Sequence, residues 1–250
     1  AAVLSSAESP MRILVISDIH ANAAALEAVL SQADPHDAVW CLGDLVGYGP
    51  DPNECVARIR ALPNLTCLSG NHDKAVLGEI DPDTFNDDAR SVIIWTRNAL
   101  AAEHLEYLRG LPVDLSMDDF TLVHGSPRQP VWEYILNRSI ACDNFPYIDT
   151  PYCLIGHSHI AGGFGEGMPC FDVPPDYAKP LTLSEQRLIL NPGGVGQPRD
   201  QNPMPAFAIL DTDARTWQYR RASYDPRITQ RRMLELGFPE RLVLRLAYGW

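Results

Sequence analysis

The sequence has no apolar run that approaches the roughly 20 residues a membrane-spanning helix needs. Basic residues are also few, since 20 Lys and Arg stand against 32 Asp and Glu and the net charge is −12. A chain of this charge repels nucleic-acid phosphates and anionic lipid headgroups, so we expect neither non-specific nucleic-acid binding nor a membrane partner. Chemistry on a phosphate group would need a cation brought in from outside the chain.

The chain also lacks any C-x-x-C spacing. Its six cysteines are scattered, several of them inside apolar runs: Cys41, Cys55, Cys67, Cys142, Cys153 and Cys170. This pattern predicts small core residues in a reducing compartment, and therefore a cytoplasmic protein. Residues 1–10 contain no basic residue and no long apolar stretch, so they do not form an intact signal peptide. We expect the natural start at Met11, with a leader or an added segment before it.

Strand and helix patterns alternate in the first part of the chain. The runs "MRILVISD", "DAVWCLGD" and "NLTCLSGNHD" are each apolar with a polar end, and helical spacing follows. Such alternation predicts a partly parallel sheet covered by helices. Residues 74–110 have a helical pattern, and short strands dominate after Pro112. We therefore expect an α/β fold with two packed sheets and outer helices, as a single domain over residues 11–250.

Polar residues that carry chemistry follow the apolar runs. Five of the seven histidines are among them. The full set is Asp18, His20, Asp44, Asn71, His72, Asp73, His124, His157 and His159. A lone Asp or His at such a place usually caps a helix or faces solvent. The whole set, flanked by small residues, indicates a shared site at the carboxyl ends of the strands.

These residue types match a divalent metal site. Imidazole, carboxylate and amide ligands without thiolate suit Mn²⁺, Fe²⁺, Ni²⁺ or Zn²⁺, whereas Ca²⁺ and Mg²⁺ prefer oxygen alone. The set is too large for one ion, but two ions about 3.5 to 4 Å apart that share a carboxylate would use it.

Five segments in sequence order, "SDIHAN", "GDLVGYGPDP", "GNHD", "VHGSPR" and "GHSH", resemble the signature blocks of the calcineurin-like metallophosphoesterases. The later "NPGGVGQPRD" is similar to a block of bacterial members, and the resemblance extends from about residue 11 to 211. It implies a four-layer α/β/β/α sandwich of two mixed sheets flanked by helices, with a helical insertion at about 74–110. It also implies a dinuclear metal-dependent enzyme that hydrolyses a phosphomonoester or phosphodiester.

The resemblance assigns a role to each matching residue. It implies a first ion held by Asp18, His20 and His159, a second held by Asn71, His124 and His157, and Asp44 as the bridge between them. Mn²⁺ is favoured among the candidate metals, and a hydroxide bridging the ions would be the nucleophile. His72 would act as general acid or hold the phosphate, so His72 and Asp44 are the expected catalytic residues.

The match departs from the family at one block. Protein phosphatases and the related diadenosine tetraphosphate hydrolases carry G-D-x-V-D-R-G, but Gly47 and Tyr48 stand here in place of the Asp and the Arg. This disfavours a protein phosphatase or dinucleoside polyphosphate hydrolase. Asp73 could take over the orientation of His72, although a helix cap is favoured. A scaffold without catalysis is an alternative of another class, but such members have lost ligands and this chain keeps all seven.

The substrate and the partners are less defined. Arg128, four residues after His124, either binds a substrate phosphate or forms an ordinary ion pair. For Arg199 an ion pair with Asp200 or Asp211 is favoured, and Tyr48, Trp132 and Tyr134 either line a leaving-group pocket or simply pack. We expect a small phosphorylated substrate, with nucleotides among the candidates, and the sequence indicates no oligomeric state.

Three further segments have expected roles. Residues 191–200 are expected to support the metal loops, and the amphipathic end from Pro239 to Trp250 is expected to cover the core rather than a partner. If the chain after Gly156 is extended, His157 and His159 point the same way with Cα atoms roughly 6.5 Å apart. That spacing predicts that the two rings serve different ions.

Overall fold

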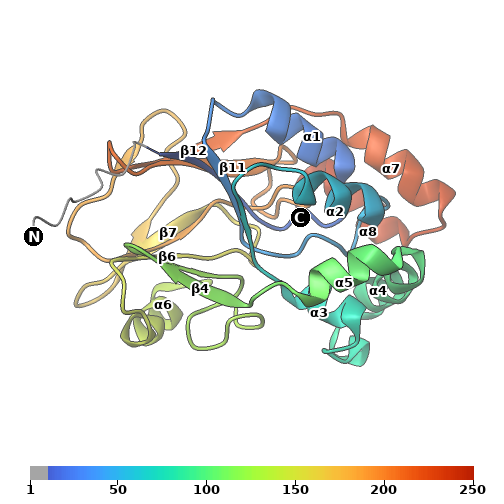
Figure 1. The fold of residues 1–250 in the computed structure, drawn as a ribbon, viewed down its shortest axis with the longest axis horizontal. Helices are drawn as coiled ribbons and strands as arrows, with labels where there is room; N and C mark the ends of the chain where they lie inside the picture. The colour runs from blue at the N-terminus through green and yellow to red at the C-terminus, as the bar shows by residue number, and fades with distance from the viewer. Residues whose placement is uncertain (1–10) are drawn as a thin grey trace, which may run out of the picture.

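The computed structural model describes residues 11–250, which form two six-stranded sheets packed face to face (Figure 1). The first sheet contains, in spatial order, β3 (Leu65–Cys67), β2 (Ala38–Cys41), β1 (Arg12–Ile16), β11 (Ala206–Asp211), β12 (Thr216–Arg221) and β9 (Leu181–Thr182). The second contains β4 (Asp114–Met117), β5 (Phe120–Val123), β6 (Tyr152–Leu154), β10 (Leu188–Asn191), β7 (Gly162–Gly165) and β8 (Phe171–Val173). Both sheets are mixed, which confirms the predicted fold class.

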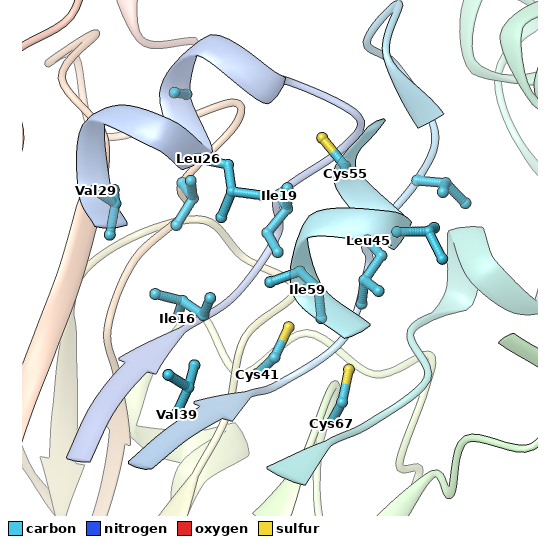
Figure 2. Close-up of a cluster of buried hydrophobic side chains, with 14 of the residues drawn as sticks. Ile16, Ile19, Leu26, Val29, Val39, Cys41, Leu45, Cys55, Ile59 and Cys67 are labelled. Atoms are coloured by element: carbon cyan, nitrogen blue, oxygen red, sulfur yellow. The ribbon is translucent and has the colours of Figure 1, made fainter. Parts of the chain in front are cut away.

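Strand β1 shows why the layers form. Side chains alternate along a strand, so Leu14 and Ile16 face one side of the sheet while Ile13 and Val15 face the other. The first pair packs under helices α1 (Ala23–Gln32) and α2 (Pro52–Arg60), as Figure 2 shows for Ile16. The second pair packs against the other sheet. Burial on both faces explains the continuous apolar run in the sequence.

The opposite outer face is covered by α6 (Arg138–Asn144) and the short 3₁₀ helix η2 (Phe145–Tyr147). Ala141 and Phe145 pack against Cys153 and Ile189 of the second sheet. The order is therefore helix, sheet, sheet, helix, as the sequence predicts. Only seven polar-rich residues form α6, too few for a recognisable helical period, and it was not predicted.

A helical group occupies the region where a helical segment was expected. It contains α3 (Asn71–Leu77), η1 (Pro82–Thr84), α4 (Asp87–Ala99) and α5 (Ala102–Arg109). It lies beside one end of the sandwich (Figure 1). No helix in the described part of the chain is long and apolar enough to cross a membrane.

The end of the chain forms α7 (Pro226–Glu235) and α8 (Glu240–Tyr248). Leu242 and Leu246 of α8 are buried in one cluster with Met233 of α7 and Tyr48. The amphipathic end therefore covers the core, as predicted. Helix α7 was missed because it is mostly polar and exposes most of its residues.

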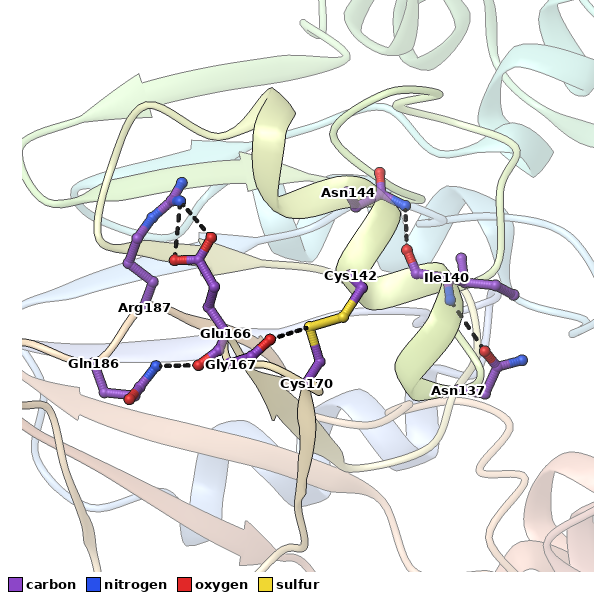
Figure 3. The surroundings of a disulfide bond; sticks show 9 residues. All are labelled: Asn137, Ile140, Cys142, Asn144, Glu166, Gly167, Cys170, Gln186 and Arg187. Atoms are coloured by element: carbon purple, nitrogen blue, oxygen red, sulfur yellow. Dashed lines mark hydrogen bonds and ion pairs between the residues drawn. A yellow bond between two sulfur atoms is a disulfide. The ribbon is translucent and has the colours of Figure 1, made fainter.

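The cysteine prediction needs a correction. Cys142 of α6 and Cys170, just before β8, form a disulfide with their Cα atoms 5.9 Å apart (Figure 3). The prediction of six reduced cysteines is wrong for this pair. Their 28-residue separation carries no C-x-x-C signal, because folding alone brings α6 over the loop before β8. The other four, at positions 41, 55, 67 and 153, are buried free thiols as predicted.

Candidate metal centre

The seven candidate ligands meet at one edge of the sandwich. Strands β1, β2 and β3 are parallel, and so are β5, β6 and β10, so each group of carboxyl ends lies on a common edge. The ligands come from the segments that follow five of these strands, six from loops and Asn71 from the first position of α3. None is more than 3% exposed: Asp18, His20, Asp44, Asn71, His124, His157 and His159.

The ligands form two halves that share Asp44. In the first half, His159 Nε2 lies 3.3 Å from Asp18 Oδ1 and 3.1 Å from His20 Nε2. Asp44 Oδ2 lies 3.6 Å from His20 Nε2 and 3.3 Å from His124 Nε2, between the halves. One carboxylate is therefore placed to bind two ions.

The second half contains His124, His157 and Asn71. Ligand atoms of Asp44, His124 and His157 all lie within 4.8 Å of one another. Asn71 Oδ1 is 3.2 Å from His124 Nε2. His157 and His159 thus belong to different halves, which agrees with the expected division of the pair.

Backbone carbonyls fix which nitrogen each imidazole presents. His20, His124 and His159 direct Nδ1 at the carbonyls of Val46, Leu42 and Gln197, at 3.1, 2.9 and 2.6 Å. A ring that donates from Nδ1 keeps a lone pair on Nε2 for a metal. His157 is reversed, since its Nε2 lies 3.1 Å from the Trp132 carbonyl and leaves Nδ1 free.

Burial gives the site unusual electrostatics. It lowers the pKa of His157 to about 3, and it lowers the pKa values of His20 and His159 well below the usual range. These rings are neutral, the form that binds metals. Burial also raises the pKa of Asp18 to about 7, and neighbouring Asp44 adds to this shift.

Asp44 and His124 form the coupled pair at the centre. Burial alone would lower the pKa of His124, but the charge and hydrogen bond of Asp44 raise it to about 9. Burial would raise the pKa of Asp44, yet His124 and His72 hold it well below its usual range. The negative charge of Asp44 thus favours a positive charge at this position. The donor set fits two divalent ions, since both carboxylates and the neutral rings converge there.

The backbone at the ligands adopts a rare conformation. Positive φ angles, between 47° and 63°, occur at Asp18, His20, Asp44, His157 and His159. This corrects one step of the sequence reasoning, because the segment after Gly156 is not extended. Ser158, between the two histidines, is buried and accepts a hydrogen bond from Asn191 Nδ2 at 3.0 Å.

His72 lies beside this centre. Its backbone N–H donates to Asp44 Oδ1 at 2.9 Å, and its ring packs on Tyr48 and Phe85. Its buried Nδ1 has no hydrogen-bond partner among residues 11–250. Gly47 explains the close approach here, since a Cβ at that position would lie 2.5 Å from Nδ1.

Asp73 is a helix cap, as favoured from the sequence. Its carboxylate accepts from the N–H groups of Gly70 and Val46, at 2.9 and 3.2 Å. It therefore stabilises the first turn of α3 and ties this helix to the loop after β2. Burial, together with the charge of Asp44, raises its pKa to about 7.

The loop over residues 191–200 supports the metal loops, as expected. Asn191 Nδ2 donates to the Gly156 carbonyl at 2.7 Å, and Gly196 N–H donates to the Asp18 carbonyl at 2.8 Å. Gly194 allows this loop to pass close to His159, because a Cβ at position 194 would lie only 2.9 Å from the Cβ of His159.

Of the two arginines near the site, Arg128 matches the ion-pair alternative, and Arg199 differs from the sequence expectation. Arg128 is paired with Glu133, whose Oε1 accepts from its Nε at 2.9 Å. The favoured ion pair of Arg199 is wrong: Asp200 binds Arg221, and Asp211 lies 3.9 Å from Arg12. Each of these carboxylates lies instead beside an arginine of a strand, Arg221 of β12 for Asp200 and Arg12 of β1 for Asp211, and closeness in the sequence does not reveal this pairing.

A cavity of about 190 Å³ opens over the second half of the centre. Trp132 and Tyr134, each 40% exposed, form part of its wall, and Tyr134 stacks on His157 at 3.7 Å. The sequence reasoning missed one stretch of this wall, Thr84, Phe85 and Asn86. These residues precede α4 and carry no signal besides the Asn86 helix cap.

Comparisons with known proteins agree with this geometry. The model of the calcineurin-like phosphoesterase superfamily domain matches residues 11–215. The crystal structure of a metallophosphoesterase from Sphaerobacter thermophilus is 47% identical and superposes with a TM-score of 0.90, covering 97% of this chain and 100% of that one. An uncharacterised protein of Methanocaldococcus jannaschii is 36% identical over 95% of this chain and 98% of its own. A symmetrical bis(5'-nucleosyl)-tetraphosphatase of Yersinia enterocolitica is 32% identical, over 44% of this chain and 38% of its own.

Proposed function

The chain belongs to the calcineurin-like phosphoesterase superfamily, and we propose that it is a dinuclear metal-dependent hydrolase of a small phosphomonoester or phosphodiester. The observation that carries the proposal is the position of Asp44. Its carboxylate lies between two buried sets of imidazole ligands, at 3.6 and 3.3 Å from the nearest nitrogen of each.

Each half of the centre would hold one divalent ion. Asp18, His20 and His159 would hold the first, and Asn71, His124 and His157 the second, with Asp44 shared. Bound ions would lower the pKa of a water toward about 7 and neutralise charge on the phosphoryl oxygens. Mn²⁺ is our first choice among Mn²⁺, Fe²⁺, Ni²⁺ and Zn²⁺, all of which accept this ligand set.

His72 is the proposed proton donor to the leaving oxygen. Burial lowers its pKa to about 4, so the ring is neutral at pH 7 before substrate binds. A phosphate brought against the ring would raise that pKa, because an anion stabilises the imidazolium. The ring borders the cavity with Asn71 and His157, so it can reach a bound ester.

Two other functions are less favoured. The similarity to the Yersinia tetraphosphatase favours a dinucleoside polyphosphate substrate, but it spans less than half of either chain, and Gly47 and Tyr48 replace the Asp and Arg of that block. A scaffold that binds partners without catalysis would not need seven buried ligands in two sets.

Metal analysis and hydrolysis test the proposal together. Protein purified without chelator should carry about two equivalents of metal and hydrolyse an aryl phosphate with Mn²⁺ stimulation. His72→Asn should lower kcat by about 100-fold or more, as expected for loss of a general acid, with unchanged metal content. His36→Asn, outside the site, is the matched control. Less than one equivalent of metal together with no Mn²⁺-stimulated turnover would refute the proposal that this protein is a metal-dependent hydrolase.

A further inference from the structure

Arg199 is a half-buried guanidinium with unused donors beside the metal centre. Its backbone N–H donates to the His159 carbonyl at 3.2 Å, which fixes the start of the side chain next to a ligand. Its Nη2 donates to Gln197 Oε1 at 3.2 Å, while its buried Nε has no partner. Within residues 11–250, no carboxylate lies within ion-pair distance of it, since Asp200 is bound to Arg221.

The guanidinium lies beside the aromatic side chains that border the site. It lies 5.7 Å from the ring centre of Tyr48, which packs against His20 and His72. Besides burial, its charge helps to lower the pKa values of His20, His72 and His159. Its charge also acts on Tyr134, where it opposes the rise in pKa that burial causes. An uncompensated positive charge at this place attracts an anion.

We propose that Arg199 binds the phosphoryl group of the substrate and makes the site selective for phosphomonoesters. The inference rests on the proposed function. A monoester has three non-bridging oxygens and a diester has two. Two metal ions can engage two of these oxygens, so only a monoester leaves a third oxygen with charge for Arg199. A guanidinium suits such an oxygen, because it combines charge with several fixed N–H donors.

Arg128 is the rival for this role and is already neutralised. Glu133 accepts from both its Nε and its Nη2, and Asp143 lies 3.7 Å from its Nη1. To bind phosphate Arg128 would have to leave two carboxylates, whereas Arg199 has none to leave.

The test compares Arg199→Gln, Arg199→Lys, Arg128→Ala and the exposed control Arg109→Ala. Their kcat and KM are measured on a mono-aryl and a bis-aryl phosphate with Mn²⁺, and the affinity of the Mn²⁺-loaded proteins for inorganic phosphate is measured by calorimetry. Arg199→Gln should weaken phosphate binding and monoester kcat/KM about 10- to 100-fold, the effect of one lost charged hydrogen bond. Diester kcat/KM should change less than about threefold, and Arg199→Lys should lie in between because it keeps the charge but not the fork.

Equal losses on both esters, or unchanged phosphate affinity, would overturn the proposal. So would loss of metal from Arg199→Gln, since the residue would then only support His159. Phosphate binding does not depend on turnover. If the wild type hydrolyses neither ester, the proposed function fails, while the calorimetry still decides the role of Arg199.

Discussion

The Cys142–Cys170 disulfide should contribute a large part of the stability of this fold. It ties α6, which covers the second sheet, to the loop before β8, and it closes a loop of 28 residues. In the chain-entropy model a loop of this length is worth about 3.6 kcal/mol at 25 °C. The Cys142→Ser/Cys170→Ser variant should therefore unfold with a free energy lower by about 2 to 4 kcal/mol. Its melting temperature should fall by about 5 to 15 °C for a chain of this size.

Urea unfolding of oxidised protein, of protein reduced with dithiothreitol and of the double variant measures this contribution. Reduced wild type and the variant should share one midpoint, below that of the oxidised protein. The variant is its own control, because dithiothreitol should not shift it when the four remaining thiols are buried and unpaired. Six free thiols in the freshly purified native protein, or equal midpoints for oxidised and reduced wild type, would refute the reasoning.

Three further predictions concern the site and its surroundings. Gly47→Ala should displace the His72 ring and lower turnover at least about 10-fold, because the added Cβ would lie 2.5 Å from His72 Nδ1. Gly237→Ala is the control, since Gly237 also has a positive φ but has open space around it. This variant should lose only about 1 kcal/mol of stability and no activity. Glu133, held by Arg128, has its pKa lowered to about 2, so it stabilises the fold above its unfolded pKa. That stability should be lost as the pH falls from about 4.5 toward 2 in acid unfolding, and Glu133→Gln should remove this part of the pH dependence. Removal of metal by a chelator should lower the unfolding free energy by about 2.7 kcal/mol or more for an ion present at 100 times its Kd. Calorimetry measures this as a lower melting temperature. An unchanged melting temperature after chelation would contradict bound metal.

The candidate ligands could be predicted because their signal is local. Each follows a predicted strand, and β1, β2 and β6 are buried on both faces, so the point where polarity returns marks the edge where the strands end. The ion-pair partner of a charged side chain is not set by its sequence neighbours. Arg199 precedes Asp200 directly, yet Asp200 is bound by Arg221 of β12. The Cys142–Cys170 pair likewise depends on how α6 packs over the loop before β8, so sequence patterns could not show it.

The backbone at the ligands also bears on the choice between an enzyme and a scaffold. Asp18, His20, Asp44, His157 and His159 all have positive φ, where a residue with a Cβ costs roughly 1 to 2 kcal/mol relative to the ordinary helical region. Glycine would relieve that strain at each position, and several neighbours, such as Gly43 and Gly156, are glycine already. A chain used only for its fold would gain stability from glycine here. The strained positions instead carry imidazole and carboxylate groups aimed at a common centre, so the cost is explained by what these side chains bind.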